Sequence, residues 1–280
     1  MVGLAQAVCG MNEKIRIGAV SYLNTKPLVH ELSVLAPQAE VILDYPSRLA
    51  DQMTRGELDV ALIPVIEYFR AGTYRLVPNI AIASQGAVLS VTLFSRVPWT
   101  EIRRVALDEG SRTSAALTQV LVRKKYGIQP EIGPLPLDRK AEDVDADAVL
   151  LIGDRAMHAC LPGFRHAFDL GQEWHDWTGL PFVYAAWAVR EGVDLGPVLD
   201  AFYEAKRRGI ENAGPIAARE APGLGLDAGF CRRYLANIIR FDLGPRELAG
   251  LHHFYMLASE LGLARRGVHV QLYEAPALAV

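Results

Sequence analysis

Short apolar runs alternate with amphipathic segments along the first quarter of the chain. Lys14–Val20 is predicted to be a buried strand and Glu40–Tyr45 the next strand. Leu58–Val65 is almost wholly apolar, as is typical of a strand in a parallel sheet that is covered on both faces. Apolar residues at helical spacing predict helices at Thr25–Leu35 and Pro46–Gly56, with a proline near each start and a glycine at the second stop. This strand–helix–strand order predicts an open α/β sheet with right-handed crossovers.

Two longer apolar strands bound a second α/β series. The β-branched run Val88–Ser95 leads into this series, and the apolar run Leu180–Arg190 ends it. The rest of the chain is predicted to be helical, with a short closing strand near Val268–Glu274. The other predicted elements are the strand Arg104–Asp108, the helix Ser111–Gly127, strands within "PEIGPLPL" and "DAVLLIGDRAMHA", and helices at Leu195–Asn212, Asp227–Ile238 and Pro245–Leu261.

This order predicts an α/β fold of two lobes, each with a mixed sheet flanked by helices and with a ligand cleft between the lobes. Lobe I is expected to be discontinuous, built from residues 15–95 and 184–280, and lobe II is expected to span residues 96–183. Residues 1–14 are expected to be a disordered leader. They lack the basic segment and the continuous apolar core of a signal peptide, and Met11 is an alternative start.

Composition excludes several classes of function. The chain has 280 residues, of which 51% are hydrophobic and 22% charged, with a net charge of −3. These values are ordinary for a globular protein and give no electrostatic reason to bind nucleic acid or an anionic membrane. No apolar run is long enough to span a bilayer, so we expect a soluble protein without a membrane partner.

The cysteines and histidines give no support for a metal site or a disulfide framework. Cys9, Cys160 and Cys231 are isolated from one another, and the sequence contains no CxxC spacing. An odd cysteine count fits a reducing cytoplasm, with Cys160 and Cys231 as small core residues. The adjacent histidines His252 and His253 would diverge on a helix and could not easily share one metal.

Polar residues follow the predicted strands, where ligands bind in open α/β sheets. Tyr22 and Asn24 come after the first strand, Ser84 precedes the first crossing between lobes, and Ser90 lies within the connecting strand. A simple turn would not need a tyrosine, which favours a functional role for Tyr22 and Asn24. We therefore expect these side chains to face a shared binding site.

The segment Ser111–Ser114 forms the predicted start of a helix directly after a strand. A helix start carries unpaired N–H groups and a partial positive charge, so it can bind an anion. Ser111, Thr113 and Ser114 would add hydroxyl donors, and Arg112 a cation. The alternative is an ordinary N-cap, in which a hydroxyl only satisfies the helix's own amides. The position beside other polar strand ends favours the anion site.

Gly153 and Asp154 follow another strand and are also candidate substrate contacts. For Asp154 the more common role is that of an N-cap for a helix beginning near Arg155. The segment "EWHDWTG" could suggest an acid–base pair in His175 and Asp176. We instead expect its tryptophans to pack against the following strand.

Five motifs occur in an order that resembles a known enzyme family. They are "AVSYLNTKPL", "GELDVALIPVIEY", "SRTSAALTQVL", "LLIGDRAM" and "DLGQEWHDWTGLPFVYAAW". Together they resemble the chorismate dehydratases of the futalosine route to menaquinone, from about Ile15 to about Ala277. The resemblance implies the two-lobed fold of type II periplasmic binding proteins. The Ser-Pro-Cys-Pro-Asn-Asp-type motif of the related dihydroxynaphthoate synthases is absent.

The resemblance implies dehydration of chorismate to 3-[(1-carboxyvinyl)oxy]benzoate, a hydro-lyase reaction that calls for no cofactor. Strong bases are scarce at the strand ends, so we expect Asn24 and Ser90 to carry catalysis by positioning groups and hydrogen bonds. A substrate carboxylate could then accept the proton. The remaining strand-end residues would bind the two carboxylates of the substrate.

Two other functions would suit the same fold. The first is a solute-binding protein that captures a small carboxylate anion without chemistry. The second is a ligand-sensing regulator, which the absence of a helix-turn-helix extension and of a basic face counts against. The sequence does not indicate the oligomeric state.

Overall fold

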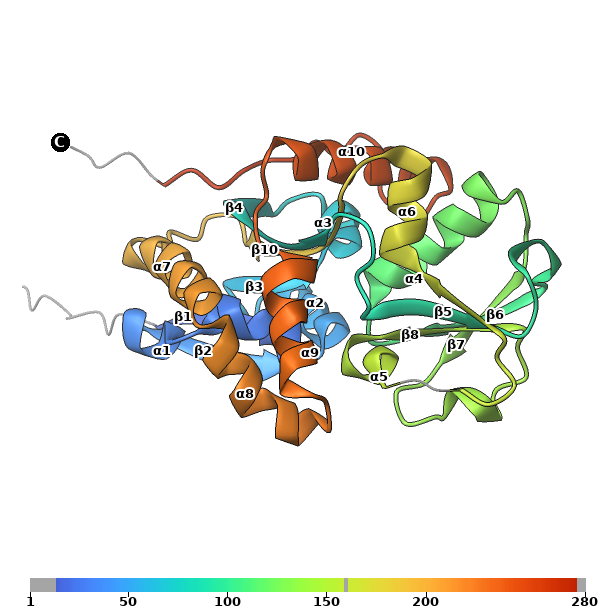
Figure 1. Cartoon of the computed structure of the whole chain (residues 1–280). Helices are drawn as coiled ribbons and strands as arrows, with labels where there is room; N and C mark the ends of the chain where they lie inside the picture. Colours follow the sequence, from blue (N-terminus) through green and yellow to red (C-terminus); the bar gives the residue numbers. More distant parts are fainter. Residues whose placement is uncertain (1–13, 159–160, 276–280) are drawn as a thin grey trace, which may run out of the picture.

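The computed structural model describes residues 14–158 and 161–275, which contain two mixed β-sheets covered by helices (Figure 1). In the described residues the first sheet has six strands in the order β11-β4-β10-β3-β1-β2. β1, β2 and β3 run parallel, and β10 and β11 run antiparallel to their neighbours. These strands are β1 (Ile15–Val20), β2 (Ala39–Asp44), β3 (Val60–Pro64), β4 (Arg75–Ser84), β10 (Phe182–Val189) and β11 (Ile239–Arg240).

The second sheet has five strands in the described residues, in the order β7-β6-β8-β5-β9. β6 pairs parallel to β7 and β8, whereas β5 pairs antiparallel to β8 and β9. The two sheets lie in separate halves of the molecule, and the second one is on the right in Figure 1. Its strands are β5 (Val91–Ser95), β6 (Arg104–Asp108), β7 (Glu131–Leu135), β8 (Ala148–Ile152) and β9 (His166–Asp169).

Helices cover the faces of both sheets. Helices α7 and α8 lie beside the first sheet, and α4 lies beside the second (Figure 1). The helices are α1 (Leu32–Leu35), α2 (Pro46–Thr54), α3 (Val65–Ala71), α4 (Arg112–Val120), α5 (Gly153–Met157), α6 (Leu170–Thr178), α7 (Pro197–Glu211), α8 (Ala213–Leu224), α9 (Ala228–Arg233) and α10 (Pro245–Glu260). Short 3₁₀ segments occupy Leu23–Val29, Trp99–Glu101 and Ala141–Asp143, and π-helical turns occupy Leu121–Lys125 and Tyr234–Ile238.

The division of the chain between the sheets differs from the predicted lobe boundaries. β5 pairs with β8 and β9, so the chain enters the second sheet before Val91 rather than after Ser95. All of β10 belongs to the first sheet, including Phe182 and Val183, which the prediction assigned to lobe II. The predicted boundary at residues 183 and 184 divides the strand Leu180–Arg190 between the lobes, but the hydrogen bonds of β10 place it wholly in the first sheet. The predicted leader lies almost entirely outside the described residues.

Several local predictions were wrong. The expected helix at Thr25–Leu35 is a 3₁₀ segment followed by one short turn, because Pro27 lies inside it and Glu31 has a positive φ of 56°. β4 was missed, since Pro78 and Asn79 resemble a turn; they form an irregularity within the strand, where Asn79 has a φ of 60°. The expected strand near Val268–Glu274 is a single bridge to Leu76.

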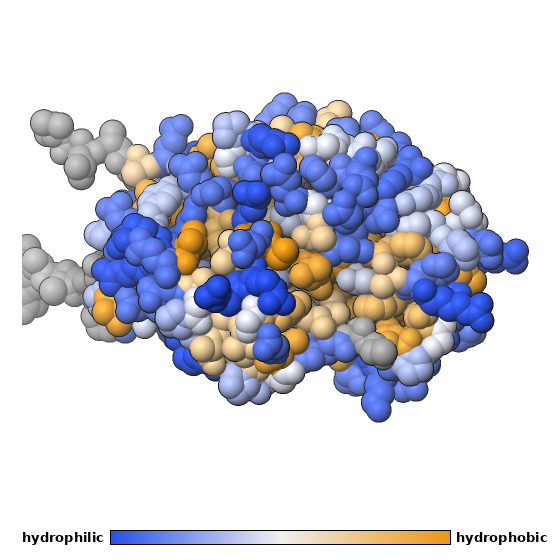
Figure 2. Space-filling model, in the orientation of Figure 1, coloured by the Kyte–Doolittle hydropathy of each residue, from blue (hydrophilic) through white to orange (hydrophobic). Residues whose placement is uncertain are grey.

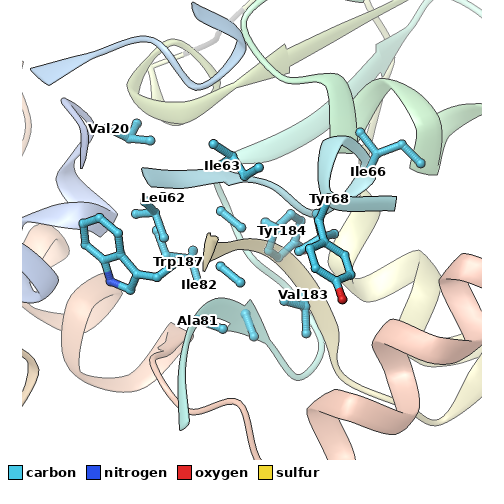
Figure 3. Packing of buried hydrophobic residues seen from close by; sticks show 14 of the residues in the cluster. Val20, Leu62, Ile63, Ile66, Tyr68, Ala81, Ile82, Val183, Tyr184 and Trp187 are labelled. Atoms are coloured by element: carbon cyan, nitrogen blue, oxygen red, sulfur yellow. The ribbon is translucent and has the colours of Figure 1, made fainter. Parts of the chain in front are cut away.

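The core follows the strands with continuous apolar sequence. Every residue of β3 and β10 is buried, and for β3 this confirms the prediction of a strand covered on both faces. Figure 3 shows side chains of these strands packed together with Val20, Ile82 and Tyr68. Trp174 of α6 is fully buried and packs edge-on against Phe182, which confirms that this tryptophan packs on the following strand.

Gly209 of α7 lies directly against the backbone of the 3₁₀ segment that carries Asn24. A Cβ at Gly209 would lie 2.0 Å from the carbonyl oxygen of Pro27. Gly209→Ala should therefore push α7 outward and lower the free energy of unfolding by about 1–3 kcal/mol. Gly223→Ala in α8 is the matched control, because its Cβ would meet no atom within 4 Å. Urea unfolding measures both variants, and equal stability of Gly209→Ala and wild type would contradict this close packing.

The exterior is mainly hydrophilic, with small apolar groups between polar ones on the face shown in Figure 2. Among the described residues, no helix combines the length and the apolar character needed to cross a membrane. Cys231 is a buried free thiol, as expected for a core residue, whereas Cys160 lies outside the described residues.

Candidate active site

A cavity lies where the ends of strands from both sheets meet. Apolar side chains from both sheets form part of its wall, including Ile82 of β4 and Ile152 of β8. Tyr184 of β10 also lines it, and burial raises the pKa of this phenol well above its usual range. Six of the ten predicted site residues line the cavity: Tyr22, Asn24, Ser90, Ser111, Ser114 and Gly153.

Tyr22 follows β1 of the first sheet, and its ring lies against Gly153, which follows β8 of the second sheet. Its ring carbons lie 3.2 Å from the position that a Cβ would occupy on Gly153, and Gly153 has a φ of +59°. Both the close approach and the backbone conformation therefore require glycine at this position. Burial, followed by the charge of Asp108, raises the pKa of the Tyr22 phenol. Tyr22 thus reaches the cavity as a neutral hydroxyl.

Asn24 and Ser90 approach the cavity from different directions. Asn24 lies in the 3₁₀ segment after β1, where its Oδ1 accepts a hydrogen bond from Thr25 Oγ1 at 3.4 Å. Ser90 is buried just before β5, and its backbone carbonyl accepts from the Gly153 N–H at 2.8 Å. The Ser90 Oγ accepts from the Tyr234 hydroxyl at 2.8 Å. The structure therefore brings together the two residues expected to carry catalysis.

The loop before Ser90 has a strained backbone that is held by Asp169. Leu89 has a φ of 64°, a conformation that non-glycine residues rarely adopt. The Asp169 carboxylate accepts from the N–H of Leu89 at 2.7 Å and from that of Val88 at 2.9 Å. It also accepts from the N–H groups that begin α6. Burial raises the pKa of Asp169, while these backbone donors act in the opposite direction. The hydrogen bonds from Val88 and Leu89 to Asp169 therefore fix the position of the adjacent Ser90.

The start of α4 carries an N-cap and also faces the cavity. Ser111 is the N-cap, because its Oγ accepts from the Ser114 N–H at 3.3 Å. The Ser111 hydroxyl also donates to Ser114 Oγ at 2.9 Å, which leaves the Ser114 proton available to another acceptor. Both serines line the cavity. The remaining first-turn amides have no partner within the helix, so capping and anion binding are compatible here.

Arg112 and Thr113 do not line the cavity. The Arg112 guanidinium pairs with both carboxylate oxygens of Asp51 at 2.8 and 2.9 Å and lies 3.4 Å from Glu67. Thr113 is fully buried, and its Oγ1 accepts from the Ile66 N–H at 3.2 Å. These contacts tie α4 to α2 and α3 of the first half of the molecule. Neither side chain is therefore placed to contact a ligand in this cavity.

Ser84 and Asp154 are likewise not among the residues that line the cavity. Ser84 Oγ donates to the Gly86 carbonyl at 3.0 Å and lies 3.2 Å from the Tyr184 hydroxyl. Asp154 is in the first turn of α5 but does not cap it, because Ile152 is the N-cap and no side chain caps that end. Burial raises the pKa of Asp154, opposed by a hydrogen bond from the Leu23 backbone. Ser84 therefore holds the segment at Gly86 and the Tyr184 side chain, and Asp154 holds the backbone at Leu23.

Metal ligands are not gathered at this site. Across residues 14–158 and 161–275, no group of three or more His, Cys, Asp or Glu side chains is arranged to hold a metal ion. The polar groups of the cavity wall are hydroxyls, an amide and helix N–H groups. Such a wall suits an anionic organic ligand.

Residues 15–260 match the sequence profile of a family described as menaquinone biosynthesis, which covers most of the chain. The chain belongs to this menaquinone-biosynthesis family. Two relatives match this chain over most of both sequences. The chorismate dehydratase of Thermus thermophilus is 32% identical over 269 residues, which are 88% of this chain and 95% of the relative. The chorismate dehydratase of Campylobacter jejuni is 26% identical over 254 residues, covering 88% of this chain and 99% of the relative.

The fold of this menaquinone-biosynthesis protein is also found among solved structures. The alkanesulfonate-binding protein SsuA from Xanthomonas axonopodis pv. citri, bound to MOPS, superposes with a TM-score of 0.67 at 15% sequence identity. The match covers 92% of this chain and 96% of SsuA. It confirms the predicted periplasmic-binding-protein-like fold, and at this identity it carries no information about the ligand.

Two tyrosines of this family member were missed by sequence reasoning. Tyr184 lies inside a continuous apolar strand, where the pattern indicates only burial. Tyr234 contacts Ser90 across a separation of 144 residues, and it lies in a segment that was predicted only as a helix. The general enrichment of π-helical turns at functional sites could have drawn attention to Tyr234, but periodicity does not reveal such a turn.

Proposed function

We propose that this protein dehydrates chorismate to 3-[(1-carboxyvinyl)oxy]benzoate, as the first step of the futalosine route to menaquinone. The observation that carries the proposal is the cavity shared by both sheets, where Asn24 and Ser90 face one space beside the start of α4. Membership of the menaquinone-biosynthesis family and the 32% identity to a chorismate dehydratase support it.

Two helix starts at the cavity suit a substrate with two carboxylates. Ser111 and Ser114 mark the start of α4, and Pro46, the first residue of α2, also lines the cavity. Each start offers free amides and a partial positive charge. We assign one carboxylate to each helix. Because α2 and α4 belong to different halves of the molecule, a bound dianion would hold the two halves together.

Dehydration removes the hydrogen at ring carbon 3 and the hydroxyl at carbon 4, and the ring becomes aromatic. The electron pair of the C3–H bond forms the new ring double bond, and the electron pair of the C4–O bond leaves with the hydroxyl oxygen. The proton from carbon 3 and the hydroxide from carbon 4 together make water. The reaction is redox-neutral, so the proposal invokes no redox cofactor. The protein's task is to orient the ring and to stabilise developing charge, which hydroxyl and amide donors can do.

Asn24 and Ser90 are assigned to the reacting centre. Both are neutral, so neither would take the proton from carbon 3 at neutral pH. We assign that role to a carboxylate of the substrate itself, held close to carbon 3 by the binding geometry. Ser90 would then donate a hydrogen bond to the departing hydroxyl, and Asn24 would orient the enolpyruvyl arm.

A non-catalytic solute-binding protein is the alternative function. Its fold would be the same, as the likeness to SsuA illustrates. The identity of 32% to a chorismate dehydratase over nearly the whole chain favours the enzyme. The cytoplasmic location expected from the isolated cysteines belongs to the same proposal, and the buried free thiol of Cys231 is consistent with it.

One assay separates the two functions. Purified protein is incubated with chorismate, and the mixture is followed by proton NMR and mass spectrometry. The proposal predicts catalytic turnover, with loss of one water and appearance of four aromatic ring protons. Binding of chorismate without conversion would support the solute-binding alternative and would contradict the proposed reaction. A heat-denatured sample controls for the spontaneous decay of chorismate.

A further inference from the structure

The buried hydroxyl of Tyr234 lies directly behind the two residues assigned to the reacting centre. Tyr234 is 1% exposed and does not line the cavity. Its hydroxyl donates to Ser90 Oγ at 2.8 Å. A side-chain hydrogen bond also joins this hydroxyl to Asn24. One phenol therefore links a residue that follows β1 to a residue that precedes β5.

The local backbone is built to bring this tyrosine to the site. Helix α9 is capped by Asp227, whose side chain accepts from the Phe230 N–H, and it ends at Arg233. The chain then widens into the π-helical turn Tyr234–Ile238 before it enters β11. A π turn changes the direction in which a side chain projects, and such turns are concentrated at functional sites. Tyr234 is the first residue of this turn.

The hydrogen bonds around Tyr234 set the direction of the Ser90 proton. Because Ser90 Oγ accepts from Tyr234, its own proton remains free to be donated into the cavity that Ser90 lines. Asn24 Oδ1 accepts from Thr25 Oγ1 at 3.4 Å, and the Asn24 side chain also interacts with this phenol. Consecutive hydrogen bonds polarise one another in a buried environment, which strengthens the final donor.

We propose that Tyr234 is a positioning residue that holds the Ser90 hydroxyl as a hydrogen-bond donor toward the departing C4 oxygen. This inference rests on the proposed function. Tyr234 transfers no proton: the C4–O bond breaks with its electron pair on oxygen, the C3 proton completes the water, and the Tyr234–Ser90 hydrogen bond persists throughout. Without the phenol, Ser90 can rotate and place a lone pair toward the substrate.

The protonation state of Tyr234 suits this role. Burial raises the pKa of the phenol, and the hydrogen bonds with Ser90 and Asn24 oppose that rise only in part. Asp154 and Asp169 act in the same direction as burial. The hydroxyl therefore stays protonated across the neutral range. The loss expected on removal of the phenol should accordingly be the same at every pH between about 6 and 9.

Four variants test the inference: Tyr234→Phe, Ser90→Ala, the double variant, and the control Tyr255→Phe. Tyr255 is also a buried tyrosine with a bonded hydroxyl, which donates to the Arg265 carbonyl and accepts from the Val268 N–H. We expect Tyr234→Phe to lower kcat by about 10- to 30-fold with KM within about threefold of wild type. In the Ser90→Ala background, the same change should lower kcat by less than about threefold. Tyr255→Phe should retain wild-type kcat.

The outcomes separate this inference from the proposed function. Absence of wild-type turnover overturns both together. Wild-type turnover with a normal kcat for Tyr234→Phe overturns this inference alone. If the two single changes lowered kcat by factors that multiply in the double variant, the inference would also be overturned, because Tyr234 would then not act through Ser90. Thermal unfolding of each variant, measured alongside, identifies any loss of activity that comes from unfolded protein.

Discussion

Ser90→Ala should lower kcat for chorismate dehydration by about 100- to 1000-fold while KM changes by less than about threefold. The Ser90 hydroxyl lines the cavity and receives a hydrogen bond from Tyr234, so its own proton is available to the substrate. Negative charge on the departing oxygen develops mainly in the transition state. A donor aimed at that oxygen therefore contributes to kcat rather than to substrate binding.

Ser95→Ala is the matched control for this experiment. Ser95 is the last residue of β5, the strand that Ser90 directly precedes; it is fully buried and donates to the Val97 carbonyl at 2.6 Å. Its replacement removes a buried serine hydroxyl without altering the cavity wall. Steady-state kinetics of both variants should show the loss for Ser90 only. Similar kcat values for Ser90→Ala and wild type would exclude Ser90 from the reacting centre.

The start of α4 should control substrate affinity. The double variant Ser111→Ala/Ser114→Ala removes two hydroxyls that line the cavity and also removes the N-cap. A hydrogen bond to a charged group contributes about 1.5–3 kcal/mol, so we expect the Kd for chorismate to rise by about 100-fold. The change in kcat at saturating substrate should be smaller, because these groups contact a carboxylate that is charged before and after the reaction.

Loss of the cap also lowers stability by about 1 kcal/mol, which must be separated from the binding effect. Thr118→Ala is the control on the same helix, since Thr118 is buried and its hydroxyl donates to the Ser114 carbonyl at 2.9 Å. Calorimetric titration with chorismate, at a temperature where unfolding curves show all variants folded, measures the affinity. A Kd for the double variant within about threefold of wild type would rule out a carboxylate at this helix start.

Much of the site could be predicted from the sequence because it depends on where strands end. Tyr22, Asn24, Ser90, Ser111 and Gly153 all follow or adjoin apolar runs that are recognisable without a structure. The ends of such strands meet at one edge of an open sheet, and the structure places these five residues around one cavity. The general position of the site therefore follows from local patterns.

The direction of each side chain could not be predicted in the same way. Arg112 is adjacent in sequence to a serine of the cavity wall, yet its guanidinium turns toward Asp51 and Glu67 of the other half of the molecule. Those partners are about 50 residues away or more, so periodicity carries no information about them. The same limit applies to Tyr234, whose contact with Ser90 joins distant parts of the chain.

The predicted fold class is correct, whereas element boundaries depend on tertiary context. β4 interrupts its own pattern with Pro78 and Asn79, yet the residues on either side of this interruption, Arg75–Leu76 and Ala81–Ser84, pair with β10 in the first sheet. The register with β10 shifts between Ala186 and Ala188, opposite this irregularity. Pairing with a strand about a hundred residues away thus outweighs the local preference for a turn.

A crystal structure with the bound product tests the central claim most directly. The account predicts that the benzoate product fills the cavity between the two sheets. One carboxylate should contact the start of α4 near Ser111. The ring carbon that carried the hydroxyl should lie beside Ser90, at a distance at which the Ser90 hydroxyl could donate a hydrogen bond to an oxygen on that carbon. Product bound in this cavity with its carboxylates away from both helix starts, or product bound outside the cavity, would contradict the account.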